Sequence, residues 1–214
     1  MNSQIPKGQG AQRNITNKFD RFTHEPEDFE LDSVKTQVTE VFPKSIINVI
    51  KSPDLMMDYS MNPYQGCEHG CSYCFARPTH EFWGYSAGVD FERKLMVKKN
   101  APELLEKTFQ KKSYVPKTIM LSGNTDCYQP IERQFEITRK LLQVCLDYRH
   151  PVSIITKNAL VLRDIDILEN LAEKNLISVS LSIPTINEDL RRVMEPRTST
   201  AKNKLKAIEV LSSK

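Results

Sequence analysis

Short apolar runs alternate with longer amphipathic segments along the chain from residue 46 onward. A short apolar run between turn residues is typical of a buried strand, whereas apolar positions three and four residues apart are typical of a helix face. On this pattern we expect strands over 45–50, 57–64, 117–122, 152–156 and 176–182. We expect helices over 101–112, 130–149, 164–174, 187–194 and 202–213.

The order of these elements predicts the fold class. Strand and helix alternate with a step of roughly 25 to 35 residues, which indicates βαβ units and a mainly parallel sheet. The chain ends at Lys214, after a predicted helix and without a returning strand. We therefore expect an α/β fold, a partial parallel (β/α) barrel that is truncated at its C-terminus.

Residues 1–45 differ from the rest of the chain. They are polar, contain several prolines and glycines, and show no sustained periodicity. This composition predicts a flexible arm that is mobile or wraps over the surface of a core spanning residues 46–214. A disordered tail without function is the alternative.

Composition narrows the class of protein. The 214 residues are 39% hydrophobic and 27% charged, which is ordinary for a globular protein and unlike a disordered one. The net charge of +3 is too small to argue by itself for binding to nucleic acid or to an anionic membrane. No apolar run approaches the roughly 20 residues that span a bilayer, and the N-terminus lacks the apolar core of a signal peptide. We therefore expect a cytoplasmic protein, whose thiols stay reduced.

Three of the five cysteines lie within eight residues, in the segment NPYQGCEHGCSYCFARPTHEF over 62–82. Cys67, Cys71 and Cys74 have the spacing C-x3-C-x2-C, which favours metal or redox chemistry over a disulfide framework. Iron–sulfur clusters are held by thiolates, and three of them on one loop leave the fourth iron of a [4Fe-4S] cube open to an outside ligand. Gly66 and Gly70 give the loop the backbone freedom to wrap such a cube.

Three alternatives remain for these cysteines. Structural zinc would need a fourth ligand such as His69 or His80, although the usual two-plus-two spacing is absent. Cys71 and Cys74 could form a redox-active disulfide, or all three residues could be plain buried cysteines. The iron–sulfur cluster is the interpretation that we prefer.

Other polar segments also follow predicted strands. The segments 122–129, 156–158 and 182–185 each lie where a predicted strand ends, as the cysteine loop does. In parallel α/β sheets the chemistry takes place at the carboxyl ends of the strands. The positions of the motifs therefore agree with the predicted fold.

The motif C-x3-C-x-aromatic-C in an α/β chain resembles the radical S-adenosylmethionine (radical SAM) superfamily. The wider segment 62–82 is similar to an uncharacterised branch related to spore photoproduct lyase, and the resemblance covers roughly residues 55–214. It implies a barrel of radical SAM type, a [4Fe-4S] cluster and SAM as cofactors, and an electron donor of the flavodoxin or ferredoxin type. In this family SAM binds the open iron, and one electron cleaves it to methionine and a 5′-deoxyadenosyl radical that abstracts hydrogen from a substrate.

The resemblance also implies roles for residues of the cysteine loop and of the segment 122–129. The cysteines match the cluster ligands, Tyr73 matches an aromatic near the SAM adenine, and Phe75 continues that wall. Packing of the loop is the alternative for Tyr73. A stretch that meets the SAM amino group corresponds to Ser122, Gly123, Asn124, Thr125 and Asp126. An ordinary polar loop is the alternative there.

Later segments carry the remaining implied contacts with SAM. Lys157 matches a lysine aimed at the SAM carboxylate, and a solvated loop lysine is the alternative. Ser182 matches a serine near the ribose or methionine part of SAM. Glu195 and Arg197 resemble the Glu-Pro-x-Thr segment of the family, with an ion pair between loops as the competing explanation.

One departure from the family bears on the substrate. Spore photoproduct lyases use a cysteine at the end of the second strand as a hydrogen donor, whereas Gly123 occupies that place here. The nearest thiol is Cys127, which could donate hydrogen only if the loop folds back. The resemblance therefore implies a lyase-like reaction of unknown substrate, with a nucleic-acid lesion and DNA as one candidate.

Further residues have open interpretations. His69, His80 and Glu81 are expected to form hydrogen bonds around the cluster, or His69 to face solvent. A basic run after the loop could follow a phosphate backbone, although the solvated face of a helix explains it better. The run consists of Lys94, Lys98, Lys99, Lys107, Lys111, Lys112 and Lys117. A non-catalytic zinc-binding or ferredoxin-like module, or an inactive fragment, is the alternative function.

Overall fold

The larger of two sheets is mainly parallel. The structure, a computed structural model, describes residues 8–19, 36–52, 54–55 and 57–214. In this part of the chain the sheet has the order β2-β3-β6-β7-β8. Its strands are Ile47–Val49, Tyr59–Met61, Ile119–Leu121, Val152–Thr156 and Ile177–Leu181. β2 runs antiparallel to β3 and the other neighbours are parallel, so the predicted α/β class is confirmed.

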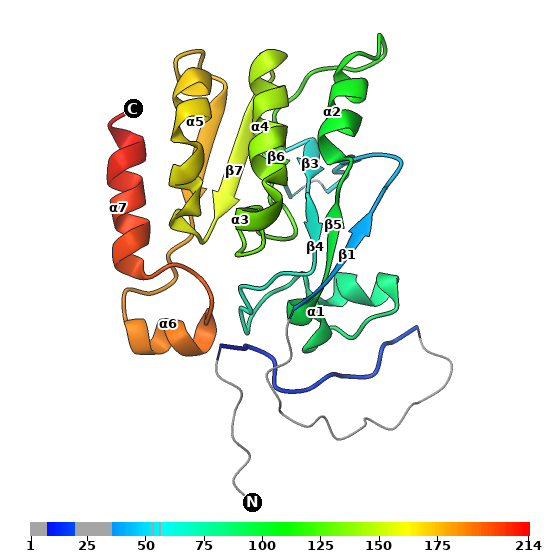
Figure 1. Ribbon diagram of the computed structural model, residues 1–214, viewed down its shortest axis with the longest axis vertical. Coiled ribbons are helices and arrows are strands. Elements are labelled where there is room, and N and C mark those ends of the chain that lie inside the picture. The colour runs from blue at the N-terminus through cyan, green and yellow to red at the C-terminus, as the bar shows by residue number, and fades with distance from the viewer. Residues whose placement is uncertain (1–7, 20–35, 53, 56) are drawn as a thin grey trace, which may run out of the picture.

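Helices cover one face of this sheet, where α4, α5 and α7 stand side by side (Figure 1). The longer helices are α2 over Ala101–Phe109, α4 over Ile137–Asp147, α5 over Ile165–Ala172 and α7 over Ala201–Ser212. An apolar layer between sheet and helices includes Leu121, Ile154, Leu141 and Leu168. The shorter α6, Glu188–Met194, lies at the end of the sheet toward which β7 points (Figure 1).

A smaller sheet joins an N-terminal segment to the region after the cysteine loop. β1 over Gln37–Val41 pairs in parallel with β5 over Lys94–Lys98, and β4 over Tyr64–Gln65 pairs antiparallel to β5. β1 lies inside the segment 1–45 that we predicted as an arm, and residues 1–7 and 20–35 of that arm lie outside the described residues. Because β1 is largely exposed, its sequence has no apolar alternation to reveal it.

The predicted helix over 130–149 is wrong, because two helices occupy this region. α3 covers Glu132–Phe135, Glu136 adopts a left-handed conformation with φ 52°, and α4 then begins at Ile137. The Glu132 carboxylate explains the break, since it is buried and accepts from the Thr138 amide at 3.0 Å. That amide belongs to the first turn of α4, where no backbone carbonyl is available to it.

Three short elements complete the described chain. They are a 3₁₀ helix over Arg77–Trp83, α1 over Asp90–Arg93 and a second 3₁₀ helix over Ala159–Asp164. The other predicted strands and helices are confirmed with ends shifted by a few residues, except that 57–64 is divided into β3 and β4. No helix among the described residues is both long and apolar enough to cross a membrane.

Candidate functional site

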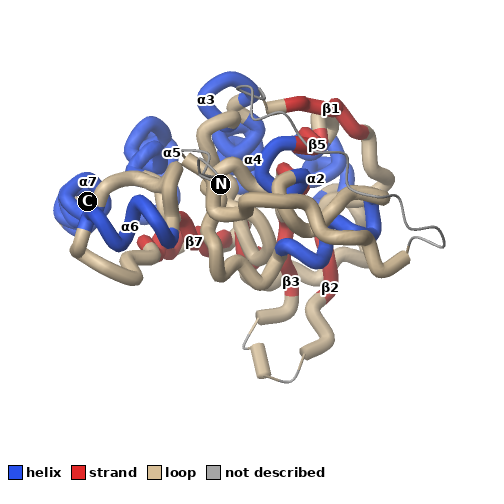
Figure 2. The backbone as a smooth tube through the Cα atoms, turned by 90° about the horizontal axis from the view of Figure 1, so that it is seen from below, coloured by secondary structure: helices blue, strands red, loops and turns tan. Residues whose placement is uncertain are grey.

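The cysteine loop begins directly after β4, at Gly66. Loops form much of the molecule when it is viewed from below, from the end where β7 terminates (Figure 2). Gly66 and Gly70 have φ angles of 78° and 65°, in the left-handed region that favours glycine. A Cβ atom at Gly66 would stand 2.8 Å from Leu95 Cδ2, so this position has no room for a side chain. Both glycines therefore shape the loop, as the sequence predicts.

The three thiols of the loop are free. Cys67 and Cys71 are buried, and Cys74 is partly buried. Burial and the nearby Cys67 raise the pKa of the Cys71 thiol, and the same two causes raise the pKa of Cys74. Three free thiols on one loop can each supply one thiolate to a cluster. A cationic iron–sulfur core would favour their thiolate forms, so the residues fit such a cluster.

A single metal ion matches the cysteines less well. Within residues 8–19, 36–52, 54–55 and 57–214, no three His, Cys, Asp or Glu side chains are grouped to hold one ion. In a cluster each thiolate binds a separate iron, so the ligands need not converge on one point. All five cysteines are free, and Cys71 is not joined to Cys74 by a disulfide.

Two distant segments hold the backbone of the cysteine loop. Gln129 donates from Nε2 to the Gly66 carbonyl at 3.1 Å and accepts from the Glu68 amide at 2.9 Å. The Ser72 amide donates to the Met194 carbonyl at 2.9 Å. The loop is therefore fixed both by the segment after β6 and by the end of α6.

Polar groups of the segment after β6 are engaged by contacts within the fold. Asn62 Oδ1 accepts from the amides of Asn124 at 2.8 Å and Thr125 at 3.1 Å. Ser122 has a φ of 79°, and its Oγ accepts from the Cys127 amide at 2.6 Å. These bonds give the loop a defined shape beside the cysteine loop.

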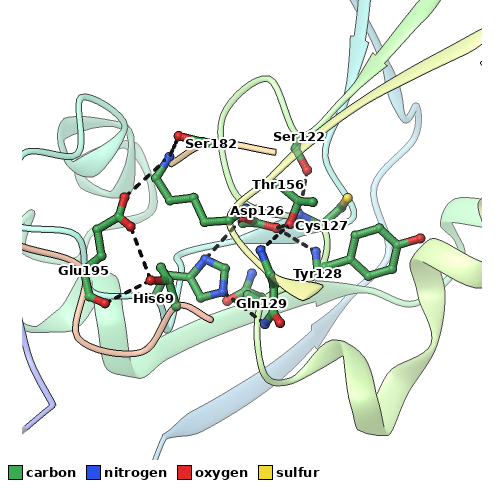
Figure 3. Close-up of polar contacts among 12 residues, drawn as sticks. His69, Ser122, Asp126, Cys127, Tyr128, Gln129, Thr156, Ser182 and Glu195 are labelled. Carbon is green, nitrogen blue, oxygen red and sulfur yellow. Dashed lines mark hydrogen bonds and ion pairs between the residues drawn. The ribbon is translucent and has the colours of Figure 1, made fainter. Parts of the chain in front are cut away.

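Asp126 lies at the centre of a buried network (Figure 3). Its carboxylate accepts from the Thr156 hydroxyl and the Lys157 amide, each at 2.7 Å, and Oδ2 lies 3.3 Å from His69 Nδ1. Burial alone would raise the pKa of Asp126, but His69 and these donors hold it below its ordinary value. Burial would lower the pKa of His69, yet Asp126 and Cys67 raise it to about 10. His69 therefore links the strand ends to the cysteine loop, and because it is buried, the expectation that it faces solvent is wrong.

Glu195 brings further predicted residues together (Figure 3). It is fully buried, and its carboxylate accepts from the Tyr73 hydroxyl of the cysteine loop. Lys204 Nζ lies 3.0 Å from Oε2, and Lys157 Nζ lies 4.0 Å from Oε1. Lys157 also donates to Ser182 Oγ at 3.1 Å. The ion pair between loops, which was the competing explanation for Glu195, is therefore present.

This arrangement leaves a positive charge near the thiols. Lys204 is buried against Glu195, whereas the Lys157 side chain is 23% exposed. The positive charge of Lys157 partly offsets the rise in the pKa of the Cys71 and Cys74 thiols. Because Lys204 already pairs with the Glu195 carboxylate, Lys157 can offer its positive charge to an anionic group that binds beside the cysteine loop.

Other predicted residues stand outside this network. Phe75 is 80% exposed. Arg197 donates its amide to the His69 carbonyl at 3.3 Å, and its side chain is partly buried. Gly123 lies against Ser60, because a Cβ atom at this glycine would stand 3.3 Å from the serine Cβ. The contacts of these three residues with SAM stay predictions.

Cys127 is part of the main apolar core. Its side chain is fully buried, and burial raises the pKa of the thiol well above its ordinary value. A hydrogen donor has to reach the substrate, so this position counts against the predicted role. Cys145 lies in the same core, where we expected it.

His80 and Glu81 have partners other than the cluster ligands. Glu81 pairs with Lys18 at 3.3 Å, and the His80 ring packs against Tyr85 and Phe91. Burial lowers the pKa of His80 to about 4. The expected bonds around the cluster are therefore not among the described contacts of these two side chains.

The basic run is divided among several elements. Lys94 and Lys98 are the ends of β5, and Lys107 lies on α2, so the run is not one helix face as we predicted. Three of its lysines are paired with carboxylates: Lys94 with Asp90 at 3.1 Å, Lys99 with Glu40 at 2.5 Å and Lys117 with Asp58 at 2.7 Å. These pairs reduce the positive field that a phosphate backbone would require.

Sequence reasoning missed Asn62, Gln129 and Lys204. Lys204 had a detectable signal, because it shares the buried face of its helix with Ala201 and Ala207. A lysine on an apolar face needs a buried partner. Asn62 and Gln129 had no such signal, since their partners are backbone groups of distant segments.

Comparison with known proteins identifies relatives along most of the chain. A sequence model of the Radical SAM superfamily matches residues 61–214. An uncharacterised protein of Mycobacterium tuberculosis is 33% identical over 173 residues, which are 80% of this chain and 51% of that protein. An uncharacterised protein of Methanocaldococcus jannaschii is 31% identical over 177 residues, covering 83% and 63% of the two chains. The chain therefore spans about half the length of the mycobacterial relative.

Solved structures with a similar fold include several of spore photoproduct lyase. A cysteine-to-serine variant aligns with a TM-score of 0.63 at 16% identity, covering 90% of this chain and 54% of the other. A complex with dinucleoside spore photoproduct aligns with a TM-score of 0.62 at 16% identity, covering 88% and 52%. A variant with bound AdoMet and the same dinucleoside gives 0.59 at 16% identity, covering 82% and 47%. The predicted type of fold is thus confirmed.

Proposed function

Because the chain belongs to the radical SAM superfamily, we propose that it is a radical SAM enzyme whose [4Fe-4S] cluster is held by Cys67, Cys71 and Cys74. When bound, the cluster supplies one electron that cleaves SAM to methionine and a 5′-deoxyadenosyl radical, which takes a hydrogen atom from the substrate. Family membership supports this general activity.

The cysteine loop is the observation that carries the proposal. Its thiols are free, two of them belong to buried residues, and Gln129 and the end of α6 fix its backbone. A ligand set that is positioned before its cofactor arrives binds with less loss of conformational entropy. Buried, uncoordinated cysteines would not need such a framework.

The charged residues near the loop provide a place for the polar part of SAM. Lys157 supplies a positive charge for the SAM carboxylate, and Ser182 and Glu195 position the ammonium group of Lys157. Backbone oxygens after β6 receive the SAM amino group, in the segment that contains Gly123 and Asp126. His69 and Thr156 of the Asp126 network are buried, which limits the access of water to this side of the proposed subsite.

Aromatic side chains provide a place for the adenine. The Tyr73 hydroxyl is held by Glu195, while the residue as a whole is 48% exposed and keeps ring surface available. Phe75, two residues further along the loop, adds exposed aromatic surface. Arg197 is proposed at the edge of this subsite.

The proposed reaction requires a reductant and a substrate, and the cluster requires a reducing compartment. We propose an electron donor of the flavodoxin or ferredoxin type and a reducing compartment such as the cytoplasm, in keeping with five free cysteines. A nucleic-acid lesion is the substrate class to test first, because solved structures of similar fold contain a dinucleoside photoproduct.

Single cysteine variants test the ligand set. Cys67→Ser, Cys71→Ser and Cys74→Ser should each lose most of the iron and sulfide that the chain binds on anaerobic reconstitution. Cys145→Ala is the control, since this core cysteine lies outside the loop and should leave iron and sulfide unchanged. Full iron and sulfide content in any of the three serine variants would remove that residue from the ligand set.

A further inference from the structure

An N-terminal segment lies against the cysteine loop. Residues 8–19, which we call the strap, run beneath α1 in dark blue (Figure 1). Although more than fifty positions separate them in sequence, Gly10 of the strap meets Gly70, between the first two cysteines. A Cβ atom at Gly10 would stand 1.8 Å from the Gly70 carbonyl oxygen. Only glycine therefore permits this approach of two backbones.

A buried carboxylate connects the strap to a cluster ligand. Glu92 is 1% exposed, and it accepts from the amides of Gly10 at 3.2 Å and Ala11 at 2.7 Å. Arg77 donates to the same carboxylate at 2.6 Å. Through Nε and Nη2, Arg77 also donates to the Cys71 carbonyl, at 3.2 and 2.8 Å. The strap, Glu92, Arg77 and the backbone of Cys71 thus form one chain of contacts.

Further side chains anchor the strap along its length. Asn14 exchanges two hydrogen bonds with Asp90, one through each of its amide atoms, at 3.0 and 2.9 Å. Ile15 exchanges two backbone bonds with the Ser86 hydroxyl at 2.8 and 2.7 Å. A segment with this many specific partners has a defined position, unlike a tail that only rests on the surface.

We propose that the strap is part of the cluster-binding unit and fixes the loop between Cys67 and Cys71. This inference rests on the proposed function, because it concerns the loop that would hold the cluster. The family model matches residues 61–214, so the strap lies outside the part of the chain that this model matches. Without the strap, Glu92 loses two of its three described donors, and Gly70 loses its backbone contact with Gly10.

The variant Gly10→Val tests this role in the full chain. Its Cβ has no space against Gly70, so the strap should lift while the main core, which it does not join, stays folded. The matched control is Gln12→Val, which places the same side chain at an exposed strap position. Asn14→Ala is a second variant that removes an anchor without a steric clash.

Two measurements report the effect of these substitutions, and the first can be made on protein without a cluster. Hydrogen exchange in residues 66–76 of the apoprotein should become about tenfold faster in Gly10→Val, because charge-assisted bonds to Glu92 are lost. After reconstitution, an iron chelator should remove the cluster about tenfold faster than from the wild type or Gln12→Val. Asn14→Ala should shift both rates in the same direction.

The outcomes separate this inference from the proposed function. If wild type binds a cluster and Gly10→Val matches Gln12→Val in both rates, the strap has no part in the cluster-binding unit. If the wild type binds no cluster under any reconstitution condition, the proposed function fails and this inference fails with it. Faster exchange together with faster cluster loss in both strap variants supports it.

Discussion

Lys204 and Glu195 form a buried ion pair whose side chains are 1% and 0% exposed. A buried carboxylate without a partner is costly, since the loss of hydration is not offset. Lys204 also donates to the Ser182 carbonyl at 3.1 Å, so it fixes the end of β8 as well. Because Lys204 neutralises Glu195, Lys157 keeps its charge for an anionic ligand.

The variant Lys204→Met should therefore affect both stability and binding. Breaking one side of a buried ion pair should lower the free energy of unfolding by about 3–5 kcal/mol, measured by urea unfolding of the apoprotein. Lys157 should then turn toward Glu195, so the affinity of the reconstituted protein for SAM should fall about tenfold. The double variant Glu195→Gln/Lys204→Met should recover most of the stability. An unchanged unfolding free energy in Lys204→Met would contradict the buried pair.

His80 makes stability depend on pH. Burial holds its pKa at about 4 in the folded protein, against about 6.5 in an unfolded chain. Between these values the unfolded state binds more protons, so this contribution is complete above pH 6.5 and is lost as the pH falls toward 4. Wild-type apoprotein should lose about 2 kcal/mol from this residue between pH 7 and pH 5.

His80→Leu is the matched variant, since leucine has a similar volume and no charge. Its unfolding free energy, measured by urea titration at both pH values, should fall less than that of the wild type. The carboxylates of the fold titrate equally in both proteins and cancel in the difference. Parallel pH profiles for the two proteins would show that His80 is not buried as a neutral ring.

Single residues of the site differ in how far the sequence reveals them. The three cysteines and the two loop glycines are recognisable because their spacing alone indicates the chemistry. Lys157, Ser182 and Glu195 could be placed only by resemblance to the family. Gln129 and the strap residues carry no local signal, because their hydrogen-bond partners lie more than fifty residues away in the sequence.

At the scale of elements, the break between α3 and α4 has the clearest consequence. Glu136 is an exposed non-glycine residue with φ 52° and ψ 32°. This conformation costs an L-residue roughly 1–2 kcal/mol, and glycine adopts it freely. The penalty is tolerated because the Glu132 carboxylate accepts a hydrogen bond from the Thr138 amide in the first turn of α4.

Glu136→Gly should therefore stabilise the protein by about 1 kcal/mol, measured by urea unfolding. Glu136→Ala should bring no such gain, because alanine keeps a Cβ atom. If 130–149 were one helix, as its apolar spacing suggests, glycine would instead destabilise it by about 1 kcal/mol. The sign of the change thus distinguishes the two structures.

Elements with a buried apolar face were predictable, and those without one were not. β6, β7 and β8 are short apolar runs, and α5 and α7 have apolar positions at helical spacing. β1 is exposed, and β5 is flanked by lysines that conceal its three buried residues. The break between α3 and α4 depends on the buried side chain of Glu132, and the spacing of apolar residues contains no information about such a contact.

At the scale of the whole molecule, the site is assembled from segments that the parallel sheet brings to one end. The cysteine loop, the segments after β6 and β7, and the stretch after α6 contact one another there. Their order in the sequence agrees with the predicted fold. Which of these segments contact one another could be learned only from the folded structure. The chain spans about half the length of its mycobacterial relative. Binding of the cluster and of SAM should therefore be measured before activity toward a substrate.

The electron paramagnetic resonance spectrum of the reduced protein tests the open iron most directly. The chain is purified without oxygen, reconstituted with iron and sulfide, reduced, and measured with and without SAM. We expect a [4Fe-4S]⁺ signal that shifts when SAM is added, because SAM would occupy the iron that the three cysteines leave open. A cluster signal that SAM does not change, or a preparation that holds zinc and no cluster, would contradict the proposed function.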